Sequence, residues 1–309
     1  MKVCVIGGGG FIGQWLVRQL LAREDAAIVI GRSPRPPGLP AEVEYIRAAY
    51  DARNTLVEVL ARVDAIVHLA YATVPSTSFS DPIHDLIANV PPTVALFQQV
   101  AAAGIARIVL VSSGGTVYGN VASLPIPENA PTNPISPYGI TKLTIERYAQ
   151  MYHALLKLPV VIVRPGNAYG VRCDGGTGGG FVTAAVRAAA CGQPLQIYGD
   201  GSAVRDYVHV SDVAAGIVAG LTEGVVGATY NIGTGIGYSN NDILRLAGIA
   251  TGQDQSHTVV RYLPFRGFDV AANVLDATLL NRATGWVPKM SIEAGIEELR
   301  RACVCPVVS

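Results

Sequence analysis

The sequence predicts an α/β protein with a doubly wound parallel sheet and a smaller C-terminal lobe. Short apolar segments rich in Val and Ile alternate with longer segments of helical periodicity up to about Arg164. After that point the pattern loosens into Gly-rich stretches, especially 175–180. Repeated βα alternation is typical of a parallel sheet covered by helices on both faces. We therefore expect a first domain at 1–165, to which the chain can return later, and a second lobe at 166–309.

The individual elements follow from length and composition. Buried parallel strands are short, apolar and rich in β-branched residues. Such strands are expected at 27–30, 65–69, 108–112 and 160–164. Helices are expected at 54–61, 92–103 and 137–156, and the Pro-rich stretch 32–40 is expected to be a surface loop.

The chain starts with a strand-like run, Lys2 to Ile6, which a glycine-rich turn and a helical segment follow. Gly7, Gly10 and Gly13 are spaced as Gly-x-x-Gly-x-x-Gly. A strand-to-helix turn of this kind brings backbone N–H groups and a helix N-terminus against a pyrophosphate. Glycine is needed because a Cβ atom would block the close approach. The motif predicts a dinucleotide bound to a Rossmann-type fold.

Tyr138 and Lys142 are four residues apart in a segment of helical character. Positions i and i+4 lie on one helix face, so the ammonium is expected near the phenol. A nearby cation favours the phenolate and is expected to lower the pKa of Tyr138. Tyr138 is then a candidate general acid/base for interconverting an alcohol and a ketone.

Composition and charge exclude several function classes. The chain has 309 residues, of which 23 are acidic and 23 basic, so its charge gives no case for binding nucleic acid. No apolar run is expected to span a membrane, and the early strand leaves no room for a signal peptide. The five cysteines and five histidines show no metal-ligand spacing. We expect no metal, reduced thiols and a cytoplasmic protein.

Several further motifs occur in a fixed order along the chain. They are the glycine turn, His68-Leu69-Ala70, Asn89, Ser112 to Gly119, Tyr138-x-x-x-Lys142, Arg164-Pro165-Gly166-Asn167, Gly199 to Val210 and Arg266 to Asp269. Over essentially its whole length the chain resembles the extended short-chain dehydrogenase/reductases, specifically the NAD-dependent epimerase/dehydratase family. The resemblance implies a nicotinamide cofactor that takes a hydride from a sugar carbon while the tyrosine takes the hydroxyl proton. It also implies a nucleotide-diphosphate sugar as substrate and a homodimer.

The resemblance assigns a cofactor set to numbered residues. Lys142 would hold the nicotinamide ribose as well as acting on Tyr138. The remaining set is Gly7, Gly10, Phe11, Ile12, Gly13, Arg32, Ser33, Asp51, Ala52, Leu69, Ala70, Asn89, Tyr138 and Pro165.

The end of the second strand reads Ile30-Gly31-Arg32-Ser33, where an acidic residue would select NAD through the ribose 2′-hydroxyl. Arg32 and Ser33 suit a 2′-phosphate instead, because guanidinium pairs well with phosphate. Arg32 could equally be a solvated loop residue. The cofactor is therefore NAD(P), with the choice between NAD and NADP left open.

The substrate residues are assigned more loosely. Arg205 and Arg266 resemble the two arginines that grip the diphosphate in this family, and bidentate recognition of phosphate suits that residue type. Asn273 aligns with the position that gates the sugar pocket. The other candidates are Thr73, Asn167, Val182, Gln196, Tyr198 and Asp269.

The loop Ser112-Ser113-Gly114-Gly115-Thr116-Val117-Tyr118 departs from the family pattern. The usual Ser or Thr that positions the sugar hydroxyl is Gly114 here. The hydroxyl must come from Ser113 or Thr116, and Ser113 is favoured if the loop bulges at its glycines. The Asp-Glu pair typical of the family's sugar dehydratases is replaced by Gly115-Thr116, which argues against elimination of water.

The sequence favours a nucleotide-sugar 4-epimerase that oxidises the sugar transiently at C4. One alternative is an NADPH-dependent reductase of a nucleotide-linked 4-keto sugar, which the same residues would serve and which Arg32 favours. A non-catalytic dinucleotide-binding regulator is the other, but it would have no use for Tyr138 and Lys142.

Overall fold

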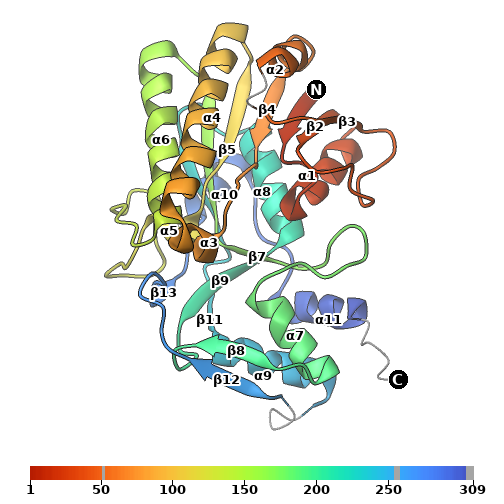
Figure 1. The fold of residues 1–309 in the computed structure, drawn as a ribbon, viewed down its shortest axis with the longest axis vertical. Coiled ribbons are helices and arrows are strands. Elements are labelled where there is room, and N and C mark those ends of the chain that lie inside the picture. The colour runs from red at the N-terminus through yellow and green to blue at the C-terminus, as the bar shows by residue number, and fades with distance from the viewer. Residues whose placement is uncertain (51–52, 254–257, 304–309) are drawn as a thin grey trace.

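Seven parallel strands form the central sheet in the computed structural model, which describes residues 1–50, 53–253 and 258–303 (Figure 1). Their order is β10-β6-β5-β4-β1-β2-β3, and every neighbouring pair is parallel. The order reverses between β1 and β4, where an open sheet of this kind leaves a crevice at its carboxyl edge. The strands are β1 (Lys2–Ile6), β2 (Ala26–Gly31), β3 (Glu44–Arg47), β4 (Ala65–His68), β5 (Arg107–Val111), β6 (Val160–Pro165) and β10 (Thr229–Ile232).

Helices cover both faces of this sheet. One apolar core joins the sheet to α1 (Phe11–Ala22), α8 (Val210–Thr222) and α10 (Thr278–Thr284). A second core on the opposite face joins it to α2 (Arg53–Leu60), α4 (Pro82–Ala103) and α6 (Pro137–Leu156). Strand β10 belongs to the central sheet, and helices α8 and α10 belong to the first of these two cores. The chain therefore returns to the first domain after residue 166.

The second lobe lies below the carboxyl edge of the sheet in Figure 1. Its larger sheet contains β7 (Asn167–Tyr169), β9 (Val204–His209), β11 (Gly237–Ser239) and β13 (Ala272–Asn273), and β8 (Leu195–Tyr198) pairs with β12 (Val260–Leu263). A third apolar core joins all of these strands except β13 to α7 (Phe181–Cys191), α9 (Asn240–Thr251) and α11 (Ile292–Ala302). Two short helices, α3 (Pro75–Ser80) and α5 (Gly114–Val117), lie in the loops after β4 and β5.

The four strands predicted at 27–30, 65–69, 108–112 and 160–164 agree with β2, β4, β5 and β6 to within one residue at each end. The helix predicted at 92–103 is too short, because α4 begins at Pro82, where Asp81 caps it by accepting from the His84 amide at 2.9 Å. Pro91 and Pro92 lie inside this helix. Proline is typical of a first helical turn, which explains the error.

The full length of α4 also bears on the membrane expectation, without deciding it. By length and composition it is the one helix of the described residues that is apolar enough to cross a membrane. One side of it packs into the second core through Leu96, Phe97 and Val100.

The expectation of reduced thiols is wrong at one position, since Cys191 is disulfide-bonded whereas Cys4, Cys173 and Cys303 are free.

Candidate active site

The glycine turn follows β1 at the carboxyl edge of the sheet. Gly7 has a φ of +85°, and a Cβ atom there would lie 2.7 Å from the Ala70 nitrogen. A Cβ on Gly13 would lie 2.5 Å from the Gly8 Cα atom. Gly10 caps α1 without a side chain, so the helix begins with uncovered backbone amides. The turn fits a pyrophosphate at this helix N-terminus.

A cleft of about 860 Å³ opens beside this turn; we call it the glycine-turn cleft. Seven predicted cofactor residues line it, namely Gly7, Gly10, Arg32, Ser33, Leu69, Ala70 and Asn89. Of the others, Phe11, Ile12 and Gly13 form the first turn of α1 and Pro165 ends β6. Asp51 and Ala52 lie outside the described residues.

Arg32 is the sole charged side chain among the described residues that line the glycine-turn cleft. The Ser33 carbonyl accepts from the Tyr45 hydroxyl at 2.6 Å, and Arg47 Nε donates to the Arg32 carbonyl at 3.3 Å. The Arg32 guanidinium has no ion-pair partner within the described chain. This end of the cleft therefore favours an anion.

Helix α6 carries Tyr138 in its first turn, behind the capping residue Ser136. One turn later, the Lys142 side chain is buried beneath the active-site surface. Its Nζ donates to the Val111 carbonyl at 3.1 Å and lies 5.8 Å from the centroid of the Tyr138 ring. It lies closer, at 4.0 Å, to the ring of Tyr71, which the sequence had not indicated.

The ionisation of this pair differs from the sequence expectation. Burial, and then Asp85, raise the pKa of Tyr138, so the expected lowering by Lys142 is wrong for this arrangement. The ammonium is directed to the Val111 carbonyl and is too distant to outweigh the lost hydration of the phenol. Burial also lowers the pKa of Lys142 to about 8, although Glu146 and Asp85 act in the opposite direction.

Ser113 is the N-cap of the one-turn helix α5 and Thr116 lies within it, and both line a second cleft beside Tyr138. The expected bulge is wrong, because neither Gly114 nor Gly115 has a positive φ. Glycine at 114 has another cause: a Cβ there would lie 2.5 Å from Leu275 Cδ1 and 2.9 Å from the Arg164 carbonyl. The Thr116 hydroxyl is enclosed without a hydrogen-bond partner.

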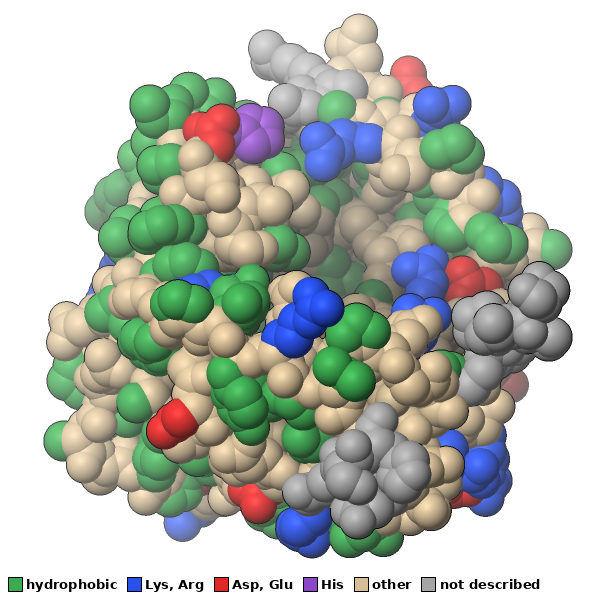
Figure 2. All heavy atoms as spheres, turned by 60° about the horizontal axis from the view of Figure 1, so that its bottom comes forward, with side chains coloured by type: hydrophobic (Ala, Val, Ile, Leu, Met, Phe, Trp, Pro, Cys, Tyr) green, Lys and Arg blue, Asp and Glu red, His purple; other side chains and the backbone are tan. Residues whose placement is uncertain are grey.

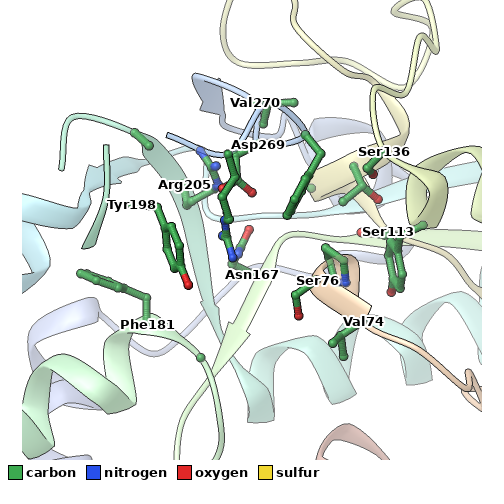
Figure 3. A pocket seen from close by; sticks show the side chains of 18 of the residues that line it. Val74, Ser76, Ser113, Ser136, Asn167, Phe181, Tyr198, Arg205, Asp269 and Val270 are labelled. Atoms are coloured by element: carbon green, nitrogen blue, oxygen red, sulfur yellow. The ribbon is translucent and has the colours of Figure 1, made fainter. Parts of the chain in front are cut away.

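This second cleft has a volume of about 430 Å³ and is lined by both lobes; we call it the two-arginine cleft. Figure 2 shows a hollow in the face of the molecule that it presents, with Lys and Arg side chains near the rim of the hollow. The Arg266 guanidinium lies 4.0 Å from the Tyr198 ring, and its Nε donates to Asp269 at 2.7 Å. Arg205, whose pKa is lowered by burial, lines the same space. Asn167, labelled in Figure 3, and Gln196 complete the predicted residues that line it.

Asp269 is the single carboxylate among the described residues of the two-arginine cleft, and Arg266 holds it. The described residues contain no group of three His, Cys, Asp or Glu side chains that could hold a metal. Tyr138 lines the two-arginine cleft, and its ring lies 4.9 Å between centroids from that of Tyr71, which lines the glycine-turn cleft. A family model described as "NAD dependent epimerase/dehydratase family" matches residues 3–233. The chain belongs to this family.

Relatives within the epimerase/dehydratase family match almost the full chain. A UDP-glucose 4-epimerase of Mycolicibacterium smegmatis is 33% identical and covers 96% of each sequence. The structure of a UDP-glucose 4-epimerase of Thermotoga maritima with UDP-glucose superposes with a TM-score of 0.90 at 30% identity, covering 98% of each chain. A Thermus thermophilus UDP-glucose 4-epimerase with NAD gives a TM-score of 0.88, also at 30% identity and 98% coverage of each.

A protein with a different activity, a sugar dehydratase, also has a similar structure. A double mutant of the dTDP-glucose 4,6-dehydratase of Streptomyces venezuelae, with NAD bound, superposes with a TM-score of 0.89 at 30% identity. It covers 96% of that chain and 98% of this one. The fold alone therefore does not separate epimerase from dehydratase, and the side chains in the two-arginine cleft must do so.

Three predicted substrate residues, Val182, Asn273 and Thr73, line neither cleft. Val182 is 1% exposed and packs in the core of the second lobe, because the helical phase of α7 turns its neighbour Phe181 to the cleft instead. Asn273 is buried, and its Nδ2 donates to the Gly114 carbonyl at 2.9 Å. It therefore lies behind the loop that carries Ser113 rather than at the cleft wall.

Thr73 likewise does not line the two-arginine cleft; its hydroxyl donates to Asp85. The sequence reading missed Asp85 altogether. Its signal was its spacing of four from Asn89, which places the two on one helix face. That signal was lost when the helix was expected to start at Pro92.

Proposed function

We propose that the protein is a nucleotide-sugar 4-epimerase acting on a UDP-linked hexose with NAD(P). The observation that supports this most is the position of Tyr138. It lines the two-arginine cleft, has Lys142 Nζ 5.8 Å from its ring centroid, and contacts Tyr71, which lines the glycine-turn cleft. The full-length relatives named UDP-glucose 4-epimerase support this activity over the reductase alternative.

The chemistry that a bound nicotinamide supplies is reversible hydride exchange with sugar C4. In its phenolate form, Tyr138 takes the proton of the C4 hydroxyl as that carbon is oxidised, and returns it after the keto sugar has turned over in the cleft. Because burial and Asp85 raise the pKa of Tyr138, this phenolate needs the positive charge of Lys142 and the charge that a bound oxidised nicotinamide would add. Lys142 supplies positive charge beside Tyr138 and a donor for the cofactor ribose. Ser113, with Thr116 as the alternative, donates to the reacting sugar oxygen.

The diphosphate is held by Arg205 and Arg266 at the far end of the two-arginine cleft. Bidentate pairing suits both groups, and the Tyr198 ring already fixes the Arg266 guanidinium. Asn167 adds a polar contact, and Phe181, Gln196 and Tyr198 surround the base. Dehydration needs an acid near the sugar, and Asp269 is held by Arg266 at the diphosphate end.

The enzyme is further proposed to be a cytoplasmic homodimer. The outer faces of α4 and α6, which lie side by side in Figure 1, expose large apolar residues such as Ile83, Ile87 and Leu155 at 68%, 60% and 72%. Such an apolar face on adjacent helices suits a second copy. Light scattering of purified protein tests this, with Leu155→Glu expected to yield monomer; a wild-type monomer contradicts it.

The activity is tested by incubating the purified enzyme with UDP-galactose and following the sugar by NMR. We expect UDP-glucose to form without net consumption of nicotinamide cofactor. We also expect acid treatment of the purified protein to release a bound nicotinamide cofactor, which its absorbance identifies. The proposal fails if UDP-, dTDP- and GDP-hexoses all stay unchanged, or if NADPH is oxidised stoichiometrically with a 4-keto sugar.

A further inference from the structure

Asp85 is a buried carboxylate beside the active-site pair that the proposed mechanism does not use. It lies on α4 and is fully enclosed. Its Oδ1 accepts from the Thr73 hydroxyl and from Asn89 Nδ2, the latter at 3.5 Å. Its Oδ2 is enclosed without a hydrogen-bond partner. A buried carboxylate is costly unless a charge or donors compensate it, so its surroundings need an explanation.

The charged groups around Lys142 come from several elements. On α6 itself, Glu146 faces it, but β6 supplies Arg164, whose Nε and Nη2 donate to Glu146 at 3.0 and 2.6 Å. His68 at the end of β4 is neutral, because burial and Lys142 lower its pKa to about 3. Two described carboxylates, Glu146 and Asp85, act on Lys142. Glu146 is already paired with Arg164, whereas Asp85 forms no ion pair with another described cation.

Tyr71 contacts both members of the active-site pair and also experiences the charge of Asp85. The Lys142 Nζ lies 4.0 Å from the centroid of its ring, and the ring meets Tyr138 edge-on at 4.9 Å between centroids. The Tyr71 hydroxyl, like Asp85 Oδ2, is enclosed without a hydrogen bond of standard geometry. Burial and Asp85 raise the pKa of Tyr71, so this phenol stays neutral.

We propose that Asp85 is a positioning residue that keeps the Lys142 ammonium charged beside Tyr138, with the Tyr71 ring in contact with the cation. The ring holds the ammonium through its π face, and Asp85 supplies the negative charge that balances it. Asp85 and Lys142 therefore act as one unit across helices α4 and α6. The ionisation itself needs no substrate, although its use in catalysis rests on the proposed function.

The sign of the effect follows from removing one negative charge. Without the Asp85 carboxylate, the pKa of Lys142 falls further below about 8, because the ammonium loses its compensating charge. The pKa of Tyr138 falls as well, because Asp85 now raises it. Both shifts have the same direction, so the whole pH–rate profile should move to lower pH in an Asp85→Asn variant.

The direct test is an NMR titration of the lysine ε-carbons. The chain has four lysines, Lys2, Lys142, Lys157 and Lys289, so ¹³Cε-lysine labelling gives four signals, and Lys142→Met assigns the one of interest. We expect Asp85→Asn to lower the Lys142 pKa by about half a unit or more. Glu58→Gln, which removes an exposed carboxylate on α2, should leave it unchanged. An unchanged Lys142 pKa in Asp85→Asn overturns the proposal.

Two further variants keep the test decisive if Asp85→Asn does not fold. Asp85→Ser is a second uncharged variant and must also lower the Lys142 pKa, whereas Asp85→Glu keeps the charge and must stay closer to wild type. The kinetic counterpart is a shift of the kcat profile to lower pH in the uncharged variant alone. Because the titration uses enzyme without substrate, an inactive wild type would refute the proposed function without affecting the result for Asp85.

Discussion

Arg164 and Glu146 form a buried ion pair that joins strand β6 to helix α6, with 2.6 Å between Nη2 and Oε2. The Arg164 Nη1 also donates to the Tyr118 hydroxyl at 2.9 Å, which in turn donates to Asn231 at 2.7 Å. Since α6 carries Tyr138 and Lys142, this network fixes the reacting helix on the sheet.

Glu146→Gln should destabilise the fold strongly. It leaves the Arg164 guanidinium buried without its counter-charge, which typically costs about 3–5 kcal/mol. The free energy of unfolding from urea titration measures this. Glu297→Gln is the control, because the Glu297 pairs with Arg300 and Arg301 are exposed and its urea midpoint should barely move. Equal losses in the free energy of unfolding would show that the buried pair stabilises the fold no more than the exposed pairs do.

Tyr138→Phe should abolish turnover and leave cofactor binding nearly intact, because only the phenolic proton is lost. A variant that keeps more than about a tenth of wild-type kcat, a barrier change below about 1.4 kcal/mol, would exclude Tyr138 as the essential acid/base. Lys142→Ala should lower both kcat and cofactor affinity. Unchanged affinity in a fluorescence titration would show that Lys142 does not contact the cofactor.

The sheet could be predicted from sequence because its information is local. Val3, Val5, Ile66 and Val67 lie in short apolar runs that are buried on both faces, as in any parallel sheet. The glycine turn was equally visible, since the approach of Ala70 to Gly7 requires a missing Cβ atom whatever the rest of the chain does.

The missed parts of the site depend on contacts between distant segments. Gly114 is explained by Leu275, which is more than 150 residues away and could not be read from the loop itself. Asn273 was placed at the cleft by alignment, but its bond to the Gly114 carbonyl takes it behind the loop. Burial, and then Asp85 of another helix, raise the pKa of Tyr138, so helical spacing to Lys142 alone gave the wrong sign.

The activity should fall on the alkaline side because of Lys142. Its pKa is lowered to about 8, so the ammonium that supports Tyr138 is present below that value and is lost as the pH rises through it. A kcat profile measured from pH 6 to 10 should show this alkaline limb, with bound cofactor held saturating. A profile that stays flat to pH 10 would show that Lys142 keeps its proton throughout.

Arg32 should discriminate between the two nicotinamide cofactors. If its guanidinium pairs with a 2′-phosphate, Arg32→Ala should weaken NADP by roughly 1.5–3 kcal/mol and NAD far less. Arg32→Lys, which keeps the charge but loses the planar fork, should fall between the two. Calorimetric titration of both cofactors with each variant measures this. Equal small losses for NAD and NADP would make Arg32 a solvated loop residue.

The last expectation concerns the hydroxyl that meets the reacting sugar oxygen. Ser113 caps α5 without a side-chain bond to the helix and lines the two-arginine cleft (Figure 3). Its hydroxyl is therefore uncommitted and faces the substrate side, whereas the Thr116 hydroxyl is enclosed. Ser113→Ala should lower kcat by roughly 10²-fold or more, the scale of losing one positioned donor.

Thr116→Val is the matched comparison, because it removes a hydroxyl one helical turn away and keeps the side-chain shape. It should cost distinctly less than Ser113→Ala when kcat is measured at saturating substrate, with the unfolding midpoint as a check on folding. The opposite ranking, a crippled Thr116→Val and an active Ser113→Ala, would assign the donor to Thr116. The Thr116 hydroxyl would then have to turn toward the sugar on binding, since its oxygen is buried in this structure although the residue lines the cleft.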